Sequence, residues 1–112
     1  MNFASDNVMG ASAPVLEAIR AANDGAQTSY GEDTITKHVE RRFAEIFERE
    51  VAVFLVATGT AANALALSAA VPPWGLCVCH REAHIMEDEC GAPEFFMHGA
   101  KVVGLDGKGA KV

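Results

Sequence analysis

A short turn of threonine and glycine, Thr58-Gly59-Thr60, lies between an apolar run at residues 51–56 and an alanine- and leucine-rich segment at residues 61–71. If the second segment is a helix, the turn lies at its N-terminus, where free backbone N–H groups and the positive end of the helix dipole attract an anion. Gly59 would let an anion approach the backbone, and the Thr60 hydroxyl would donate a hydrogen bond while capping the helix. This chemistry suits a phosphate, although the Gly-x4-Gly-Lys-Ser/Thr and Gly-x-Gly-x-x-Gly motifs are both absent. The alternative is a structural turn in which Thr60 only caps the helix and Gly59 only turns the chain.

A second group of reactive side chains lies between residues 77 and 90, which contain the three cysteines, two of the four histidines and a run of three acids. A zinc site is disfavoured, because Cys77 and Cys79 point to the same side of a strand and no second pair with Cys-x2-Cys spacing follows. The alternative is a strand whose C-terminal end brings His80 and His84 to a cleft, where ligands bind in open α/β sheets. The acidic run is equally consistent with a solvated helix face.

The elements that would position these groups follow from the spacing of the apolar residues. We expect helices at residues 13–23, 35–49, 61–71 and 84–90, and strands at residues 51–56, 76–79 and 101–105. Ser12 is the expected N-cap of the first helix, and Asp33 or Thr34 that of the second. The second helix carries an apolar stripe on one face, formed by positions 35, 39, 43, 46 and 47.

The apolar run at residues 51–56 does not alternate between apolar and polar positions, so we expect a strand that is buried on both faces of a parallel sheet. The order of elements predicts an α/β layered fold with a parallel or mixed sheet. A chain of 112 residues allows one domain at most. Because three strands are too few to cover a doubly buried strand, we expect the chain to be the opening part of a larger domain.

Composition excludes several classes of protein. The net charge of −6, with only nine lysine and arginine residues, disfavours a nucleic-acid-binding surface. One tyrosine and one tryptophan are too few for a base-stacking platform. The N-terminus lacks a signal-peptide pattern, and no run is apolar enough to span a membrane. Three cysteines without a secretory context are typical of reduced thiols, so we expect a cytoplasmic protein.

Four segments together resemble the N-terminal part of the low-specificity L-threonine aldolases. They are Phe3-Ala-Ser5-Asp6-Asn7, Ser29-Tyr30-Gly31-Glu32-Asp33, the stretch from Glu50 to Asn63, and the stretch from His80 to Pro93. The resemblance covers nearly the whole chain, in the order and spacing of that family. It implies the three-layer αβα large domain of a fold-type-I enzyme that depends on pyridoxal 5'-phosphate (PLP). The activity it implies is cleavage of L-threonine or L-allo-threonine to glycine and an aldehyde.

The resemblance also implies roles for individual residues. Gly59 and Thr60 would hold the PLP phosphate, and the resemblance thereby favours the phosphate interpretation of their turn. His84 would lie against the pyridine ring, close to the substrate hydroxyl. Glu89 would lie on the His84 side of the site. Ser5 would help to bind the substrate carboxylate.

Tyr30, in the loop before the second helix, would reach the site of a neighbouring subunit, which implies a homodimer or homotetramer. Asn7 stands where many members of the family have threonine, a departure that leaves the expectation for Ser5 intact.

One group essential to PLP chemistry has no counterpart in this sequence. None of its four lysines, Lys37, Lys101, Lys108 and Lys111, matches the lysine that attaches PLP in the family. The acidic partner of the pyridine nitrogen and the arginines for the substrate carboxylate are likewise unmatched. We therefore expect residues 1–112 to be a partial, truncated large domain, inactive alone. The alternatives are another fold-type-I PLP lyase or transferase, or a small phosphate- or metal-binding α/β module.

Overall fold

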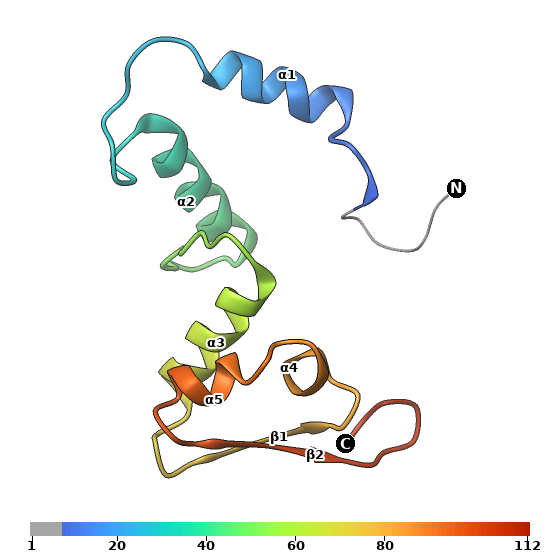
Figure 1. Ribbon diagram of the computed structural model, residues 1–112. Coiled ribbons are helices and arrows are strands. Elements are labelled where there is room, and N and C mark those ends of the chain that lie inside the picture. Colours follow the sequence, from blue (N-terminus) through green and yellow to red (C-terminus); the bar gives the residue numbers. More distant parts are fainter. Residues whose placement is uncertain (1–7) are drawn as a thin grey trace. The chain divides into compact units, whose positions relative to one another are not determined.

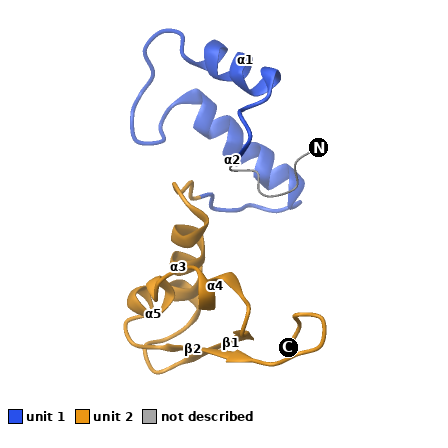
Figure 2. Ribbon diagram, turned by 45° about the vertical axis from the view of Figure 1, so that its right-hand side comes forward, with its two compact units in different colours: residues 1–53 blue, residues 54–112 orange. Residues whose placement is uncertain are grey.

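A computed structural model describes residues 8–112, and the chain divides into two units, residues 1–53 and residues 54–112. The first unit contains helices α1 and α2 (Figure 1). The second unit contains helices α3, α4 and α5 and strands β1 and β2 (Figure 2). No helix in the described range is long and apolar enough to cross a membrane.

The first helix of the first unit begins where the sequence predicts, and the second begins one residue earlier than predicted. Helix α1, Ala13–Ala22, follows Ser12, which occupies the N-cap position without a side-chain hydrogen bond. Helix α2, Thr34–Ile46, follows Asp33, whose carboxylate accepts hydrogen bonds from the Thr36 N–H at 2.8 Å and the Thr36 hydroxyl at 2.7 Å. Of the two predicted caps, Asp33 and Thr34, Asp33 is therefore the correct one.

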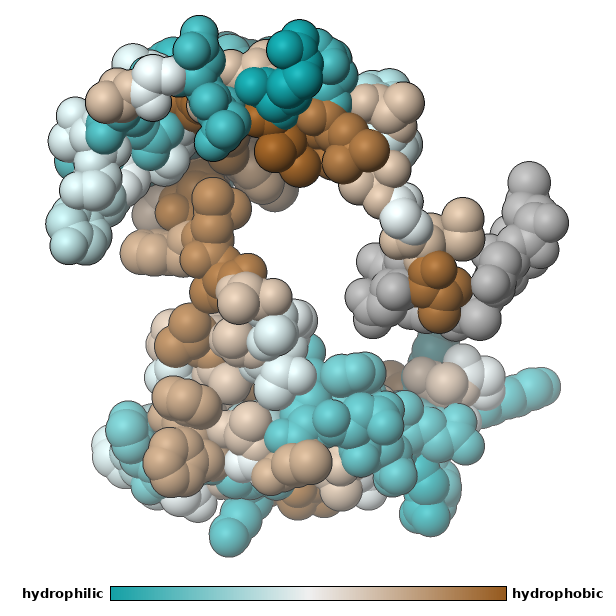
Figure 3. Space-filling model, turned by 45° about the horizontal axis from the view of Figure 1, so that its top comes forward, coloured by the Kyte–Doolittle hydropathy of each residue, from teal (hydrophilic) through white to brown (hydrophobic). Residues whose placement is uncertain are grey.

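Helix α2 is shorter than predicted at its C-terminal end. It stops at Ile46 instead of continuing to position 49, and Glu48 adopts a left-handed backbone conformation with φ 52°. The rings of Phe43 and Phe47 stack with their centroids 6.3 Å apart, but no residue of this fully described helix is buried. The apolar stripe is therefore real but largely open to solvent. Figure 3 shows brown apolar surface among teal hydrophilic patches on the face in view.

The predicted strand at residues 51–56 is wrong. These residues, all of them described, form neither strand nor helix, and the Phe54 side chain is 84% exposed. A strand requires a neighbouring backbone to complete its hydrogen bonds, and the described strands pair only with each other. An apolar run indicates that a segment is suited to burial, but it does not identify the partner strand.

The second unit is built around a two-stranded parallel sheet. Its elements are α3 Gly59–Ala70, β1 Leu76–His80, α4 His84–Glu87, α5 Ala92–Phe96 and β2 Lys101–Leu105. Strands β1 and β2 pair in the register Leu76↔Lys101 to His80↔Leu105, so the predicted strand positions and the parallel arrangement are confirmed. The three helices lie on the same side of the strands in both ribbon views (Figures 1 and 2).

A small apolar core joins the helices to the sheet. Met97, Ala100 and Val102 are buried, and Leu67 of α3 is among the side chains that pack against them. Cys77 and Cys79 also pack against this core, as their shared side of the strand predicts, whereas the alternate residue Val78 is exposed. The core therefore links α3 to the segments that carry the histidines.

The segment between the strands contains two short helices where one was predicted. Helix α4 ends at Glu87, earlier than the predicted end at residue 90, and α5 was not predicted. Gly91 precedes α5 with φ 74°, a conformation that suits glycine, and a proline lies in the first turn of α5. This left-handed turn changes the direction of the chain, so α4 and α5 are two separate helices.

Candidate functional site

The N-terminus of α3 presents unused backbone donors. Thr58 is the N-cap, and its Oγ1 accepts a hydrogen bond from the Ala61 N–H at 3.1 Å. The Ala62 N–H donates to the Thr58 carbonyl at 3.2 Å. Among the hydrogen bonds of the described residues, none satisfies the N–H groups of Gly59 and Thr60. These two donors form what we call the α3 nest.

The helix cap is one position on which the sequence prediction was wrong. Thr60 lies inside the first turn of α3, so its hydroxyl does not cap the helix, and Thr58 does so instead. Both threonines have the residue type that an N-cap requires, and the helix begins two residues earlier than predicted. The correction leaves the Thr60 hydroxyl without a capping role, and therefore available to a ligand.

Gly59 is not required by the local backbone or by packing. Its φ is not in the left-handed region, and a Cβ added there would meet no heavy atom of residues 8–112 within 4 Å. Glycine in a helix is less favourable than alanine by roughly 1 kcal/mol, so its presence needs another reason. An anion that approaches the α3 nest closely would supply one, because a side chain at position 59 would obstruct it. The purely structural explanation of this glycine is therefore weakened.

Three polar side chains meet between α3 and the segment that follows β1. The Asn63 Nδ2 donates a hydrogen bond to the Glu89 Oε1 at 2.6 Å, and the His84 Nδ1 lies 2.7 Å from the same oxygen. The Glu89 side chain is fully buried, whereas the His84 side chain is 64% exposed. The cluster therefore holds one edge of an exposed imidazole against a buried carboxyl group.

Hydrogen bonding favours the ionised form of Glu89. Its burial alone would raise its pKa, but the hydrogen bonds from Asn63 and His84, together with the charge of His84, outweigh burial and lower the pKa below the ordinary 4.5. The second oxygen, Oε2, is also buried and has no hydrogen-bond partner among the described residues. Glu89 therefore does not belong to a solvated helix face, although its neighbours Glu87 and Asp88 are exposed.

The remaining candidates take different positions. The His80 Nδ1 accepts a hydrogen bond from the Glu82 N–H at 3.2 Å, so His80 stabilises the turn after β1. Tyr30 lies in the first unit, with its side chain 99% exposed and a left-handed backbone conformation. Ser5, the predicted ligand of the substrate carboxylate, lies outside the described residues. Within the described range, no group of three or more His, Cys, Asp or Glu side chains is arranged to hold a metal ion.

Sequence reasoning missed the role of Asn63. It lies three residues after Thr60 on α3, and residues at that spacing are neighbours on a helix surface. The same helix therefore carries the α3 nest and, one turn later, the donor that contacts Glu89. Helical spacing could have placed Asn63 near the nest, but its partner lies 26 residues further along the chain.

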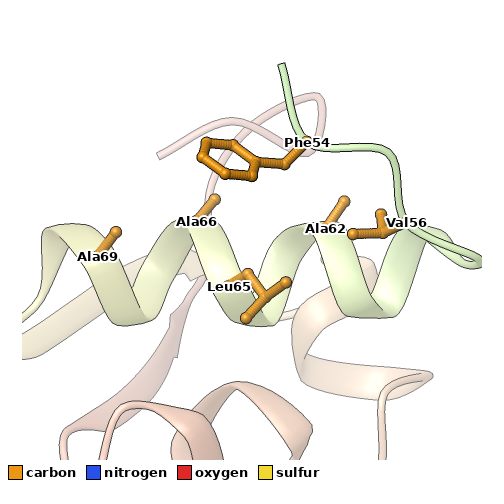
Figure 4. A pocket seen from close by; sticks show the side chains of 6 residues that line it. All are labelled: Phe54, Val56, Ala62, Leu65, Ala66 and Ala69. Carbon is orange, nitrogen blue, oxygen red and sulfur yellow. The ribbon is translucent and has the colours of Figure 1, made fainter. Parts of the chain in front are cut away.

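An apolar groove of about 450 Å³ lies along another side of α3 (Figure 4). Its lining consists of Phe54, Val56, Ala62, Leu65, Ala66 and Ala69. None of these side chains can donate, accept or transfer a proton. The groove is therefore separate in chemistry from the polar cluster of Asn63, His84 and Glu89.

Comparisons with known proteins identify relatives over most of the chain. The chain is 40% identical over 110 residues to a low specificity L-threonine aldolase of a Pseudomonas species, covering 98% of this chain and 32% of that protein. It is 42% identical over 101 residues to a low specificity L-threonine aldolase of Pseudomonas aeruginosa, covering 90% of this chain and 29% of that protein. The chain thus spans about a third of the length of these relatives.

A solved structure shows the same fold. The threonine aldolase of Leishmania major matches with a TM-score of 0.80 and 29% identity, covering 93% of this chain and 30% of that chain. This match confirms the expected α/β fold, as an N-terminal part of the large domain of a fold-type-I enzyme. The sequence model of beta-eliminating lyases matches residues 2–112. Because that match covers almost every residue, the chain belongs to the beta-eliminating lyase family.

Proposed function

We propose that this chain is part of a PLP-dependent aldolase that cleaves L-threonine and L-allo-threonine to glycine and acetaldehyde. The observation that carries the proposal is that one helix, α3, connects an anion site to an acid–base group. Its first turn offers the unpaired N–H groups of Gly59 and Thr60, and Asn63 in the next turn contacts the carboxyl group that holds His84. The names of both curated relatives and of the solved structure support the same activity.

The described residues fit the phosphate end of PLP. A phosphate at the α3 nest would accept hydrogen bonds from the Gly59 and Thr60 N–H groups and from the Thr60 hydroxyl. The open space around Gly59 leaves room for its approach. An exposed imidazole at His84 offers a face for the pyridine ring. When bound, PLP supplies an electron sink for the carbanion left at Cα after the Cα–Cβ bond breaks.

The chain's own residues hold the cofactor and handle the proton. His84 accepts the proton of the substrate's β-hydroxyl group as the Cα–Cβ bond breaks, and the aldehyde leaves. Glu89 stabilises the protonated imidazole through the contact at Nδ1. Ser5 is proposed to bind the substrate carboxylate, and Tyr30 to reach the site of a neighbouring subunit. The role of Tyr30 implies a homodimer or homotetramer. We further propose that the enzyme is located in the cytoplasm and has no nucleic-acid or membrane partner.

Product analysis tests this function. The test uses the complete enzyme, by which we mean the longest natural reading frame that contains residues 1–112, purified with PLP. We expect a visible absorption band from bound PLP, and equal amounts of glycine and acetaldehyde from L-threonine and from L-allo-threonine. Release of ammonia and an oxo acid in their place would identify a β-eliminating enzyme of the same fold. A protein that binds phosphate but not PLP would identify a phosphate-binding module.

A further inference from the structure

We propose that Asn63 is a positioning residue that acts through Glu89 to fix the tautomer of His84, so that Nε2 is the nitrogen that exchanges protons with the substrate. This inference deepens the proposed function and rests on it. It assigns to a residue of α3 a role that is exerted through the Glu89 carboxyl group. It also makes Glu89 a positioning residue, since its carboxyl group faces His84 and Asn63.

Two contacts converge on one oxygen of the Glu89 carboxyl group. The Asn63 Nδ2 and the His84 Nδ1 lie 2.6 Å and 2.7 Å from the same atom, the Glu89 Oε1. An ionised carboxylate has no proton to donate, so both neighbours must donate to it. The amide of Asn63 supplies one proton, and the imidazole must supply the other from Nδ1. In the neutral ring Nε2 then carries the lone pair, which is the state that a base requires.

The Glu89 side chain is held in place by few contacts. Glu89 follows the end of α4 and precedes Gly91, in a stretch that is neither helix nor strand. The backbone here is held by hydrogen bonds from the Asp88 N–H to the His84 carbonyl and from the Ala92 N–H to the Glu89 carbonyl, both at 2.9 Å. Neither bond fixes the Glu89 side chain, which is fully buried. Its Oε2 has no partner among the described residues, so the described contacts to the carboxylate are those on Oε1. Of these two contacts, that of Asn63 comes from the 12-residue helix α3 and that of His84 from the four-residue helix α4.

The Nε2 edge of the His84 imidazole lies away from the contact with Glu89. Helix α4 is a single turn, and the His84 side chain is 64% exposed. With Nδ1 directed at a buried oxygen, Nε2 is the ring nitrogen that remains accessible. When Nε2 accepts a proton, the resulting imidazolium is paired at Nδ1 with the carboxylate. Without Asn63, His84 would be the remaining described donor to the Glu89 carboxylate. The carboxylate would then be free to rotate away from the imidazole.

A purely structural role for Asn63 makes a different prediction. If Asn63 only satisfies a buried carboxylate, its loss lowers the stability of the fold and leaves the tautomer of His84 unchanged. If Asn63 positions Glu89, its loss yields a mixture of the two neutral tautomers even in folded protein. The two roles are therefore separated by a measurement on the imidazole itself, and not by activity alone.

The test is ¹⁵N NMR of the complete enzyme labelled at histidine, with His84→Asn used to assign the His84 signals. We expect a neutral Nδ1–H tautomer in the parent, and mixed tautomers in folded Asn63→Ala, with kcat/KM for glycine release reduced about 10- to 100-fold. Asn63→Gln, which keeps the amide donor, should recover part of that loss. Ser68→Ala is the matched control, because it removes a polar group from the same helix. Among the described residues, the hydrogen bond of the Ser68 hydroxyl goes to the Leu65 carbonyl, at 2.9 Å.

A double-mutant cycle tests whether Asn63 acts through Glu89. In a Glu89→Ala background, Asn63→Ala should change neither the tautomer nor kcat/KM further. Additive losses would overturn the inference. So would a neutral Nε2–H tautomer in the parent, a measurement that needs no variant to fold. An enzyme without aldolase activity but with the Nδ1–H tautomer would refute the proposed function and leave the positioning role supported.

Discussion

Thr58 and Thr60 offer a matched pair of substitutions that separates the helix cap from the anion site. Thr58→Ala removes the Oγ1 acceptor that the Ala61 N–H contacts at 3.1 Å. Loss of an N-cap side chain costs about 1 kcal/mol, so we expect the free energy of unfolding to fall by about that amount. Thr60→Ala removes no hydrogen bond of the described structure, and a change at such a position alters stability by at most about 0.5 kcal/mol.

The order of the two variants should be reversed for cofactor binding. The Thr60 hydroxyl is the proposed phosphate donor, and losing one hydrogen bond to a phosphate costs about 1–2 kcal/mol. The dissociation constant for PLP should therefore rise about 5- to 30-fold in Thr60→Ala. Thr58→Ala keeps the Gly59 and Thr60 N–H groups and the Thr60 hydroxyl, so its PLP affinity should fall by less than about 5-fold.

Two measurements on the complete apoenzyme decide the matter. Urea unfolding followed by circular dichroism, at one protein concentration, reports the free energy of unfolding. Titration with PLP, followed by absorbance, reports the dissociation constant. If Thr60→Ala destabilises the apoenzyme as much as Thr58→Ala does, the Thr60 side chain also stabilises the helix N-terminus and the assignment of the cap to Thr58 alone is wrong. If neither variant affects PLP affinity, the phosphate does not bind at the α3 nest.

Three further predictions concern the same site. Gly59→Val should leave the fold of the apoenzyme intact, because an added Cβ meets no atom of the described residues within 4 Å. The variant should nevertheless lose PLP on dialysis, and full retention of PLP would show that the phosphate does not bind at the α3 nest. The lowered pKa of Glu89 means that its ionised form stabilises the folded state above its ordinary pKa, and that this contribution is lost as pH falls through the lowered pKa. The difference in free energy of unfolding between the parent and Glu89→Gln should accordingly shrink on acidification, and a difference that grows would show that the protonated form is favoured. His84→Phe should retain PLP and slow cleavage by about 10²–10⁴-fold, whereas His84→Asn should bind PLP more weakly; an unchanged rate in both variants would make His84 structural.

Local patterns predicted the elements whose determinants lie close together in the sequence. Helix α2 begins at its predicted cap because Asp33 contacts Thr36, only three residues away. Strand β2 has its predicted bounds, and β1 differs from its prediction by one residue at one end. The termini of α2 and α4 were less predictable, because positive-φ residues such as Glu48 end or redirect the chain and are not glycines.

Features that depend on distant parts of the chain were predicted less well. The run at residues 51–56 has the composition of a buried strand, but composition does not supply the adjacent backbone that a strand needs. Helix α5 was missed because only five residues form it, too few to show helical periodicity. The burial of Glu89 could not be inferred from its acidic neighbours, since it depends on Asn63, 26 residues earlier.

The candidate site shows the same division between local and distant determinants. The resemblance named Gly59, Thr60, His84 and Glu89 separately, and local chemistry alone left the turn before α3 open to a structural explanation. The structure adds the physical connection: Thr60 and Asn63 share one helix, and Asn63 contacts the carboxyl group that holds His84. Because a helix fixes the spacing of residues three apart, anything bound at the α3 nest lies at a set distance from the anchor of the imidazole. Under the proposed function, one helix would position a bound anion and a proton acceptor together, which is what bond cleavage beside a phosphate-anchored cofactor requires.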